Sequence, residues 1–192
     1  TLFDGRGGLA TGVLLESGRC RVDAPTLAPR LVPALTLLLA MPKGKKLDAC
    51  VRSATELGVG SIQLATSERT QQAAPKLERL VRVLREAARQ SEQLHMPTLL
   101  SPAPLLEVAP HASEAVRCWG CFARVRSDDS RRAPSKTPDE VVVAVGPEGG
   151  FTPDEVDALV ARGYRPLSLG PGVLRVETAV PAALALARAR LR

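Results

Sequence analysis

Short apolar runs alternate with amphipathic segments from residue 34 to the end of the chain. The apolar runs predict strands, at residues 34–40, 61–65, 115–123, 140–145 and 166–169. The amphipathic segments predict helices, at residues 47–55, 75–94, 153–162 and 178–191. Strands that alternate with helices in this way favour one α/β domain with a parallel sheet.

Several predicted helix ends carry clear boundary signals. Thr152 is a good N-cap, Pro153 suits the first helical position, and Glu155 completes a capping box. Gly58 and Gly163 each follow a predicted helix, as glycines at the C′ position do. These signals support the helix boundaries independently of the apolar pattern.

The helix predicted over residues 75–94 has the most regular pattern. Its apolar face carries residues at helical spacing, namely Leu77, Leu80, Val81, Leu84 and Ala88. Its other face is basic and includes Lys76, Arg79, Arg82 and Arg89. A solvated surface is the simpler interpretation of these cations, and contact with an RNA backbone is the alternative.

The first 24 residues have a different pattern. Short alternating runs predict two or three strands, with turns at residues 5–8 and at Gly18. Pro25, Pro29 and Pro33 then predict a linker. These strands are too few to close a barrel or a sandwich on their own.

Composition narrows the choice of partner only slightly. The chain of 192 residues is 45% hydrophobic and 24% charged, as ordinary globular proteins are. No apolar run is long enough to span a bilayer, and the amino end resembles no signal peptide or transit segment, so no membrane partner is expected. A net charge of +6 favours a polyanionic partner such as nucleic acid.

The 4 cysteines do not form the dense pattern of a disulfide scaffold. A structural zinc site needs more ligands than the Cys118–Cys121 pair, and no histidine lies at a useful spacing, so no metal is expected. A thiol oxidoreductase that uses this pair is a weak alternative. Its first cysteine does not stand at a predicted helix start, where a redox thiol has its pKa lowered.

Two loops could carry chemistry. The first, GPEGG at residues 146–150, lies between a buried strand and a helix, where ligands of parallel sheets bind. Its glycines allow close approach of the backbone to a ligand, although a tight turn without a ligand would also explain them. The second, residues 169–179, holds Arg175 and Glu177 next to the start of the last helix. A surface ion pair is the simpler explanation of these two residues.

Together the two loops resemble a known family. The motifs GPEGGF (146–151) and LGPGVLRVETA (169–179) resemble the SPOUT superfamily, and within it the family that methylates N3 of a uridine in bacterial-type 16S ribosomal RNA. Three further segments match the family, namely KKLDACVRSATELGV (45–59), SERT (67–70) and EAARQS (86–91). Residues 3–22 resemble the end of the family's amino-terminal barrel, which is similar to a PUA module.

The resemblance implies more than the pattern does. It implies a partial PUA-like β domain and linker at residues 1–30, and a SPOUT methyltransferase domain at residues 31–192 with a deep carboxy-terminal trefoil knot. It also implies a homodimer that acts on small-subunit ribosomal RNA in a 30S-type particle. The compartment would be the cytoplasm of a bacterium, or the chloroplast or mitochondrion of a eukaryote.

The implied cofactor is S-adenosylmethionine. The residues expected to bind it are Gly146, Pro147, Glu148, Gly149, Gly150, Leu169, Gly170, Val173, Leu174 and Thr178. Arg69 and Gln90 are expected to face the RNA.

Methyl transfer to N3 of uridine requires loss of the N3 proton, because the neutral imide nitrogen is a poor nucleophile. A guanidinium can stabilise charge that develops on the base, and a carboxylate can take the proton. We therefore expect Arg175 to stabilise charge, and Glu177 to anchor the helix end or handle the proton.

The chain departs from the family at several points. Gln93 stands where relatives usually have arginine, and the strand that carries Cys118 and Cys121 lacks their polar end. Most of the barrel that would help to grip the ribosome is absent from residues 1–30. A SPOUT enzyme with another RNA target, and a non-catalytic RNA-binding protein of the same fold, stay open as alternatives.

Overall fold

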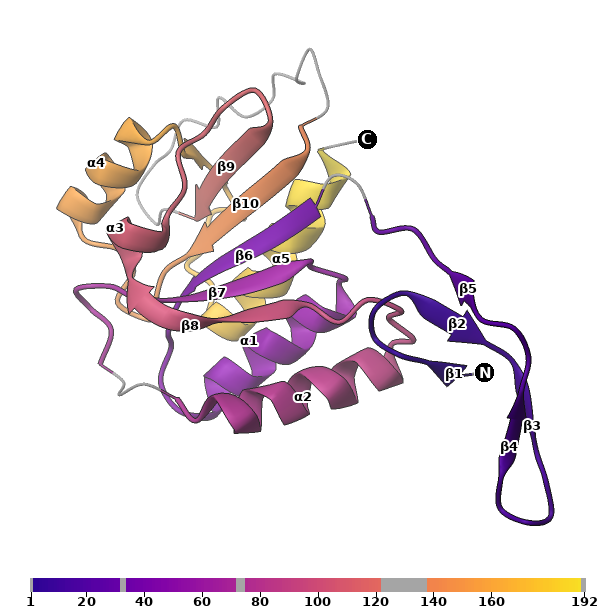
Figure 1. The fold of residues 1–192 in the computed structure, drawn as a ribbon. Coiled ribbons are helices and arrows are strands. Elements are labelled where there is room, and N and C mark those ends of the chain that lie inside the picture. Colours follow the sequence, from indigo (N-terminus) through magenta and orange to yellow (C-terminus); the bar gives the residue numbers. More distant parts are fainter. Residues whose placement is uncertain (1, 32–33, 72–74, 122–137, 191–192) are drawn as a thin grey trace.

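A six-stranded parallel sheet forms the centre of the molecule (Figure 1). The computed structural model describes residues 2–31, 34–71, 75–121 and 138–190. The strand order is β11-β9-β10-β6-β7-β8, and every neighbouring pair is parallel. The strands are β6 (Ala34–Ala40), β7 (Ser61–Thr66), β8 (Thr98–Pro104), β9 (Val116–Cys121), β10 (Glu140–Val145) and β11 (Arg165–Pro166).

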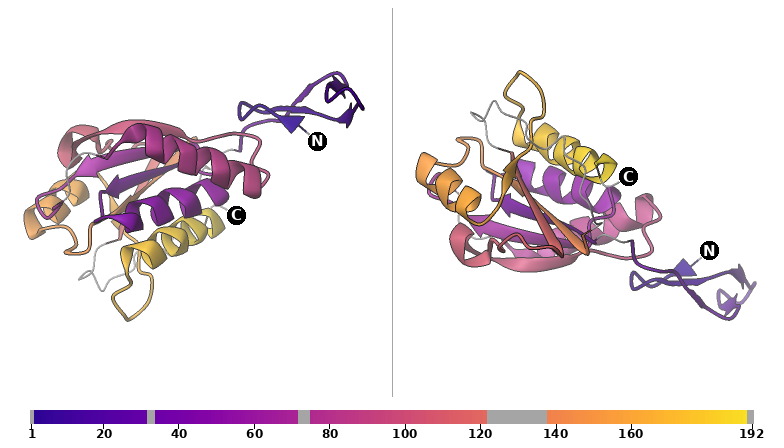
Figure 2. Two further views of the ribbon diagram at one scale, coloured as in Figure 1. Left: turned by 90° about the horizontal axis from the view of Figure 1, so that it is seen from below. Right: turned by 90° about the horizontal axis from the view of Figure 1, so that it is seen from above.

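Helices cover both faces of this sheet, as the two views of Figure 2 show. They are α1 (Lys45–Glu56), α2 (Leu77–Gln90), α3 (Leu105–Val108), α4 (Pro153–Ala161) and α5 (Val176–Ala189). Apolar residues of α1, α2 and α5 form one core with the sheet, and those of α3 and α4 form a second core on the opposite face. Among the described residues, no helix is long and apolar enough to cross a bilayer.

The alternation of side chains along β6 builds both cores. Leu35, Leu37 and Leu39 lie in the core under α1, α2 and α5, while Leu38 and Ala40 lie in the other. Parallel strands that are covered on both faces are almost continuously apolar, which is why this run, in which only Thr36 is polar, predicted a buried strand. Burial of each such leucine contributes roughly 1.5–3 kcal/mol.

The structure confirms the predicted parallel α/β domain and corrects some of its boundaries. The strands 34–40 and 140–145 have the predicted bounds, and the Thr152–Glu155 capping box is present. Helix α2 is shorter than residues 75–94, and α5 begins at Val176 rather than at residue 178. Strand β11 covers residues 165–166 instead of 166–169. The end of the strand predicted at 115–123, and the polar loop up to residue 137, lie outside the described residues.

The sequence pattern missed β8 and the short helix α3. Strand β8 lies at the edge of the sheet and pairs only with β7 among the described strands. Pro102 and Pro104 interrupt its pattern, and prolines are tolerated at a sheet edge because one side of the strand makes no ladder bonds. Helix α3 has only 4 residues, too few to show a helical period.

The amino-terminal residues form short antiparallel strands beside the α/β domain. They are β1 (Leu2–Phe3), β2 (Gly8–Ala10), β3 (Gly12–Leu14), β4 (Cys20–Val22) and β5 (Thr26–Leu27). This region therefore has more strands than predicted, and β5 lies within the predicted linker. The backbone nitrogen of Gly7 donates to the Leu94 carbonyl at 2.9 Å, and that of Met96 donates to Gly5 at 2.8 Å. These bonds attach the segment near the end of α2, as Figure 1 shows.

Candidate active site

A cavity of about 1180 Å³ opens at the carboxyl edge of the sheet. The loops that follow β10 and β11 supply most of its lining, and the ends of α1, β9 and β10 and the first turn of α5 supply the rest. The lining consists of Lys46, Cys121, Val145, Gly146, Pro147, Glu148, Gly149, Gly150, Leu167, Ser168, Leu169, Gly170, Pro171, Gly172, Val173, Leu174, Arg175, Val176 and Ala179. The two loops singled out in the sequence are thus brought together in one site.

The loop at residues 146–150 has a backbone that only glycine fits well. A Cβ atom on Gly146 would lie 3.2 Å from the backbone nitrogen of Phe151, closer than most real contacts. Gly150 has a φ of 69°, which L side chains rarely adopt, and its nitrogen donates to the Pro147 carbonyl at 2.8 Å. The loop is therefore a tight turn whose wall along the cavity is formed largely by backbone.

The segment that follows β7 braces this loop from behind. The Arg69 Nη1 atom donates to the Gly149 carbonyl at 2.6 Å, and the Glu68 backbone nitrogen donates to Glu155 Oε1 at 2.8 Å. The other oxygen of Glu155 accepts from the backbone nitrogen of Thr152 at 2.9 Å. Glu155 thus serves the capping box and ties two loops together. Arg69, expected to face RNA, has further N–H groups beyond the one that it gives to Gly149.

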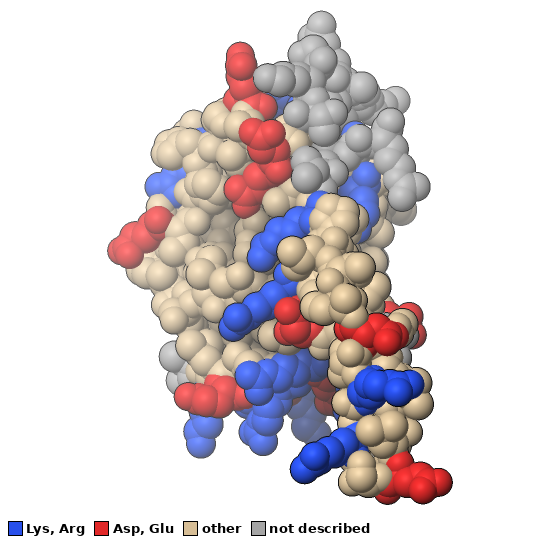
Figure 3. Space-filling view, turned by 45° about the vertical axis from the view of Figure 1, so that its right-hand side comes forward, with Lys and Arg blue, Asp and Glu red and all other residues tan. Residues whose placement is uncertain are grey.

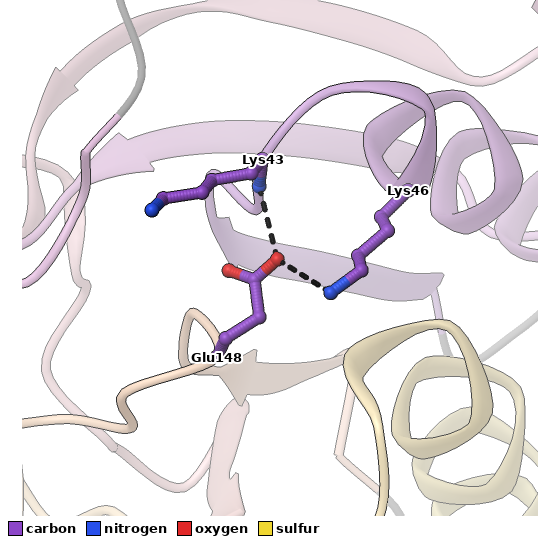
Figure 4. Close-up of polar contacts among 3 residues, drawn as sticks. All are labelled: Lys43, Lys46 and Glu148. Atoms are coloured by element: carbon purple, nitrogen blue, oxygen red, sulfur yellow. Dashed lines mark hydrogen bonds and ion pairs between the residues drawn. The ribbon is translucent and has the colours of Figure 1, made fainter.

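An ion pair joins the same loop to the start of α1 (Figure 4). The Lys46 Nζ atom lies 3.0 Å from Glu148 Oε1, and the backbone nitrogen of Lys43 donates to the same oxygen at 3.2 Å. Partial burial acts to raise the pKa of Glu148, but the hydrogen bonds from Lys46 and from backbone groups outweigh it. The pKa of Glu148 therefore lies below its usual value, and the carboxylate stays charged.

The loop that follows β11 forms the opposite wall of the cavity. Gly170 has a φ of 120°, so the turn at this position needs glycine. Val173 is 87% exposed and Leu174 is 38% exposed, which leaves apolar side chains uncovered at the rim. Arg175 is the N-cap residue of α5 and lines the cavity. The expected charge-stabilising residue therefore lies in the same cavity as the glycine loop.

Glu177, Thr178 and Gln90 lie outside the cavity lining. Glu177 has a buried Oε2 atom without a hydrogen-bond partner in the described part of the chain. Burial is the main cause that raises the pKa of Cys50 on α1 to about 12, and the negative charge of Glu177 acts in the same direction. The Glu177 carboxylate therefore lies toward α1. Thr178 is exposed on α5, and Gln90 is exposed at the far end of α2, where the amino-terminal strands attach. The roles expected for these residues stay predictions.

The structure adds residues to the site that sequence reasoning did not select. Lys46 and Cys121 stand out, because each comes from an element other than the two loops. The signal for Lys46 was its position just after a buried strand, at the edge where ligands of parallel sheets bind. Cys121 ends β9, and burial raises the pKa of its thiol to about 12, so it contributes a neutral, weakly polar surface.

The composition of the lining limits what the site can bind. It offers apolar side chains, backbone groups of glycine-rich turns and the charged groups Lys46, Glu148 and Arg175. Such a lining suits a small molecule that combines an apolar ring with polar and charged ends. Among the described residues, no group of three or more His, Cys, Asp or Glu side chains could hold a metal ion.

The chain is similar to known RNA methyltransferases. Residues 30–188 match the family described as RNA methyltransferase domain. A protein from Synechocystis sp. named ribosomal RNA small subunit methyltransferase E is 36% identical over 162 residues, which are 82% of this chain and 54% of the relative. A protein of the same name from Mycobacterium tuberculosis is 32% identical over 95% of this chain and 75% of its own length.

A solved structure agrees with these matches. The ribosomal RNA small subunit methyltransferase E from Neisseria gonorrhoeae, bound to S-adenosyl methionine, superposes with a TM-score of 0.79 at 28% identity. The superposition covers 97% of this chain and 81% of that protein. The chain spans about half the length of the Synechocystis relative. The chain belongs to the RNA methyltransferase domain family, the family of the ribosomal RNA small subunit methyltransferases E.

Proposed function

We propose that this protein is an S-adenosylmethionine-dependent methyltransferase that modifies N3 of a uridine in small-subunit ribosomal RNA. The observation that carries the proposal is the single cavity in which the glycine loop 146–150 meets the loop that ends at Arg175. The similar proteins from Synechocystis and Mycobacterium tuberculosis are named ribosomal RNA small subunit methyltransferases, which supports ribosomal RNA as the substrate. The motifs at residues 146–151 and 169–179, which resemble the uridine-N3 family, support N3 as the methylated atom.

The cavity fits the proposed cofactor. Gly146, Gly149 and Gly150 line the cavity without side chains, so backbone groups at these positions can meet the ligand directly. Leu169, Val173 and Leu174 offer apolar surface for an adenine ring. The relative from Neisseria gonorrhoeae is described as bound to S-adenosyl methionine, which supports the same ligand here. When bound, this cofactor supplies an electrophilic methyl group on a sulfonium.

The side chains of the cavity would position the acceptor and balance its charge. Arg175 is placed to stabilise the negative charge that develops on the uracil ring as the N3 proton leaves. Glu177 does not line the cavity, so proton handling by this residue would require a rearrangement or a second subunit. A role of Glu177 in anchoring the start of α5 would require neither a rearrangement nor a second subunit.

RNA must also contact the protein outside the cavity. Arg82, Arg85 and Arg89 are exposed on α2, and no ion pair of theirs exists within the described residues. Figure 3 shows Lys and Arg side chains gathered at the lower end of the α/β domain, with acidic side chains among them. Charge complementarity with phosphate supports this helix as an RNA-backbone surface.

The proposal includes the finer features of the family. We propose a homodimer, supported by the apolar Val173 that stands exposed at the rim of the cavity. We also propose the trefoil knot in the carboxy-terminal segment, and a PUA-like origin for the amino-terminal strands. The compartment is proposed to be the bacterial cytoplasm or the corresponding eukaryotic organelle.

Titration calorimetry followed by product analysis tests the proposal. We expect saturable binding of S-adenosylmethionine, near one site per subunit, and 3-methyluridine in nuclease digests of treated 30S particles. A methyl group on another position would identify a related enzyme with a different target. A folded protein that binds RNA but not S-adenosylmethionine would point to the non-catalytic alternative.

A further inference from the structure

Three charged side chains line the cavity, and two of them are already in contact. Glu148 accepts from Lys46 and from the Lys43 backbone through the same oxygen, at 3.0 and 3.2 Å. The carboxylate is thus directed toward the start of α1 (Figure 4). Glu148, which was expected to bind cofactor and lines the cavity, holds Lys46 through these contacts.

Lys46 keeps binding capacity despite this contact. An ammonium group has three N–H donors, and Glu148 accepts only one of them. The Lys46 side chain is 40% exposed, so the remaining donors can meet a ligand in the cavity that it lines. Its backbone is fixed, because Leu47 and Cys50 in the same turn of α1 are fully buried.

The pair is placed differently from an ordinary surface ion pair. Exposed pairs usually contribute little to stability, since solvent screens them. This pair instead connects the first turn of α1 to the loop that follows β10, across 102 positions of sequence and at the edge of a cavity. The cations Lys46 and Arg175 outnumber Glu148 there, which leaves a positive excess for an anionic ligand.

We infer that Lys46, positioned by Glu148, binds an oxyanion of a ligand in the cavity. Two sources share this chemistry: the carboxylate of the methyl donor, which is its only anionic group, and a phosphate oxygen of the acceptor RNA. Arg175 then remains available to stabilise charge on the uracil ring. The inference rests on the proposed function and adds a residue role to the same site.

Two binding measurements distinguish the sources. The first is titration calorimetry of Lys46→Met with S-adenosylmethionine and with decarboxylated S-adenosylmethionine. Loss of the donor carboxylate contact weakens the first ligand on the order of tenfold and leaves the second unchanged. The second is the salt dependence of binding to a 16S ribosomal RNA fragment. Loss of a phosphate contact makes its log–log slope shallower by about 0.7–0.9.

Three further variants separate a specific role from a general effect of charge. Lys46→Arg keeps the charge and is expected to restore most of the affinity. Glu148→Gln weakens the hold on Lys46 and is expected to give a partial loss in the same measurement. Lys45→Met is the matched control, because Lys45 is exposed one residue away and does not line the cavity.

The outcomes also separate the inference from the proposed function. If the wild-type chain binds S-adenosylmethionine and RNA, and folded Lys46→Met binds both equally well with an unchanged salt slope, the inference is wrong. Equal losses in Lys46→Met and Lys45→Met would also overturn it, since they would reflect net charge alone. Failure of the wild-type chain to bind S-adenosylmethionine would instead contradict the proposed function.

Discussion

At the scale of single residues, the site depends on two kinds of position. At the first kind, neighbouring backbone leaves no room for a side chain, and at the second kind a helix start holds a charged residue in place. Gly146 belongs to the first kind, because its surroundings are backbone atoms of the same loop. Backbone cannot move aside as a flexible side chain can. Arg175 and Lys46 belong to the second kind, since each is anchored at the beginning of a helix that packs into the core.

Replacement of Gly146 by alanine should weaken cofactor binding. The new Cβ would lie 3.2 Å from the Phe151 nitrogen and 3.3 Å from Gly150, so the loop must shift. We expect the affinity for S-adenosylmethionine to fall on the order of tenfold, or about 1.4 kcal/mol, in titration calorimetry. Gly60→Ala is the control, because its Cβ would meet only the Leu35 carbonyl at 3.8 Å. Equal affinities of the two variants would contradict this account of the loop.

Replacement of Arg175 by alanine should slow methyl transfer without weakening the binding of S-adenosylmethionine. If the guanidinium stabilises charge on the base, we expect the single-turnover rate constant for methylation of 30S particles to fall roughly 100-fold. The Kd for S-adenosylmethionine should stay within about twofold, and Arg175→Lys should recover part of the rate. Full turnover by Arg175→Ala would eliminate this role.

At the scale of elements, the loops on the carboxyl edge are connected to one another by hydrogen bonds that cross between segments. Glu155, in the first turn of α4, joins the capping box to the loop that follows β7. Lys46, in the first turn of α1, joins the loop that follows β10. Helix starts therefore act as the attachment points of the site, because their first N–H groups and first-turn side chains face the same edge.

Replacement of Glu155 by alanine should destabilise the fold. The substitution removes the acceptor of the Thr152 and Glu68 backbone nitrogens, and Glu155 is 9% exposed, so both donors lose a buried partner. We expect the free energy of unfolding in urea to fall by about 2 kcal/mol. Asp154→Ala, an exposed change in the same helical turn, serves as the control and should have a smaller effect. Similar losses for both would show that α4 lacks a functioning capping box.

Charge reversal on α2 should weaken RNA binding in a salt-dependent manner. We expect Arg82→Glu with Arg85→Glu to lower the affinity for a 16S ribosomal RNA fragment and to make the salt slope shallower by about 1.4–1.8. Fluorescence anisotropy over a salt series measures both quantities. Glu86→Gln on the same exposed helix surface is the control of opposite sign, and should leave the affinity equal or higher. An unchanged salt slope in the double variant would show that the basic face of α2 is a solvated surface that does not contact RNA.

At the scale of the whole molecule, two layers of helices cover the sheet, and the cysteines of α1 and β9 lie between these layers and the sheet or at its edge. Burial is the largest cause that raises the thiol pKa of Cys50 to about 12, of Cys118 to about 11 and of Cys121 to about 12. These thiols stay protonated at neutral pH, so the Cys118–Cys121 pair has the opposite character to a redox pair. Cys20, on the amino-terminal strands, is exposed.

Thiol alkylation should follow this distribution. At pH 8 we expect iodoacetamide to modify Cys20 of the native protein within minutes, and the buried Cys50 and Cys118 only after denaturation, as mass spectrometry of peptides would show. The raised pKa values also predict that stability is lost as pH rises. Above about pH 9 the unfolded thiols lose protons that the folded ones keep, so the free energy of unfolding falls. Rapid alkylation of Cys118 in the native state would contradict its burial.

The sequence by itself determined the elements with strong local signals. The largely apolar run of β6 and the capping box of α4 are encoded within a few residues, and β6 and the start of α4 lie where they were predicted. It also determined the two loops, because glycine at fixed spacing constrains the backbone wherever the loop lies. It could not reveal β8, since an edge strand with prolines has neither an alternating nor a continuous apolar pattern.

Only the tertiary structure decided which charged residues meet. Lys46 and Glu148 are far apart in sequence, and their contact exists because β6 and β10 are neighbours in the sheet and both end at its carboxyl edge. Conversely, Glu177 follows Arg175 by two residues, yet only Arg175 lines the cavity. Arg175 caps α5 in extended conformation whereas Glu177 lies in the first helical turn, so the turn of the helix directs the two side chains to different sides.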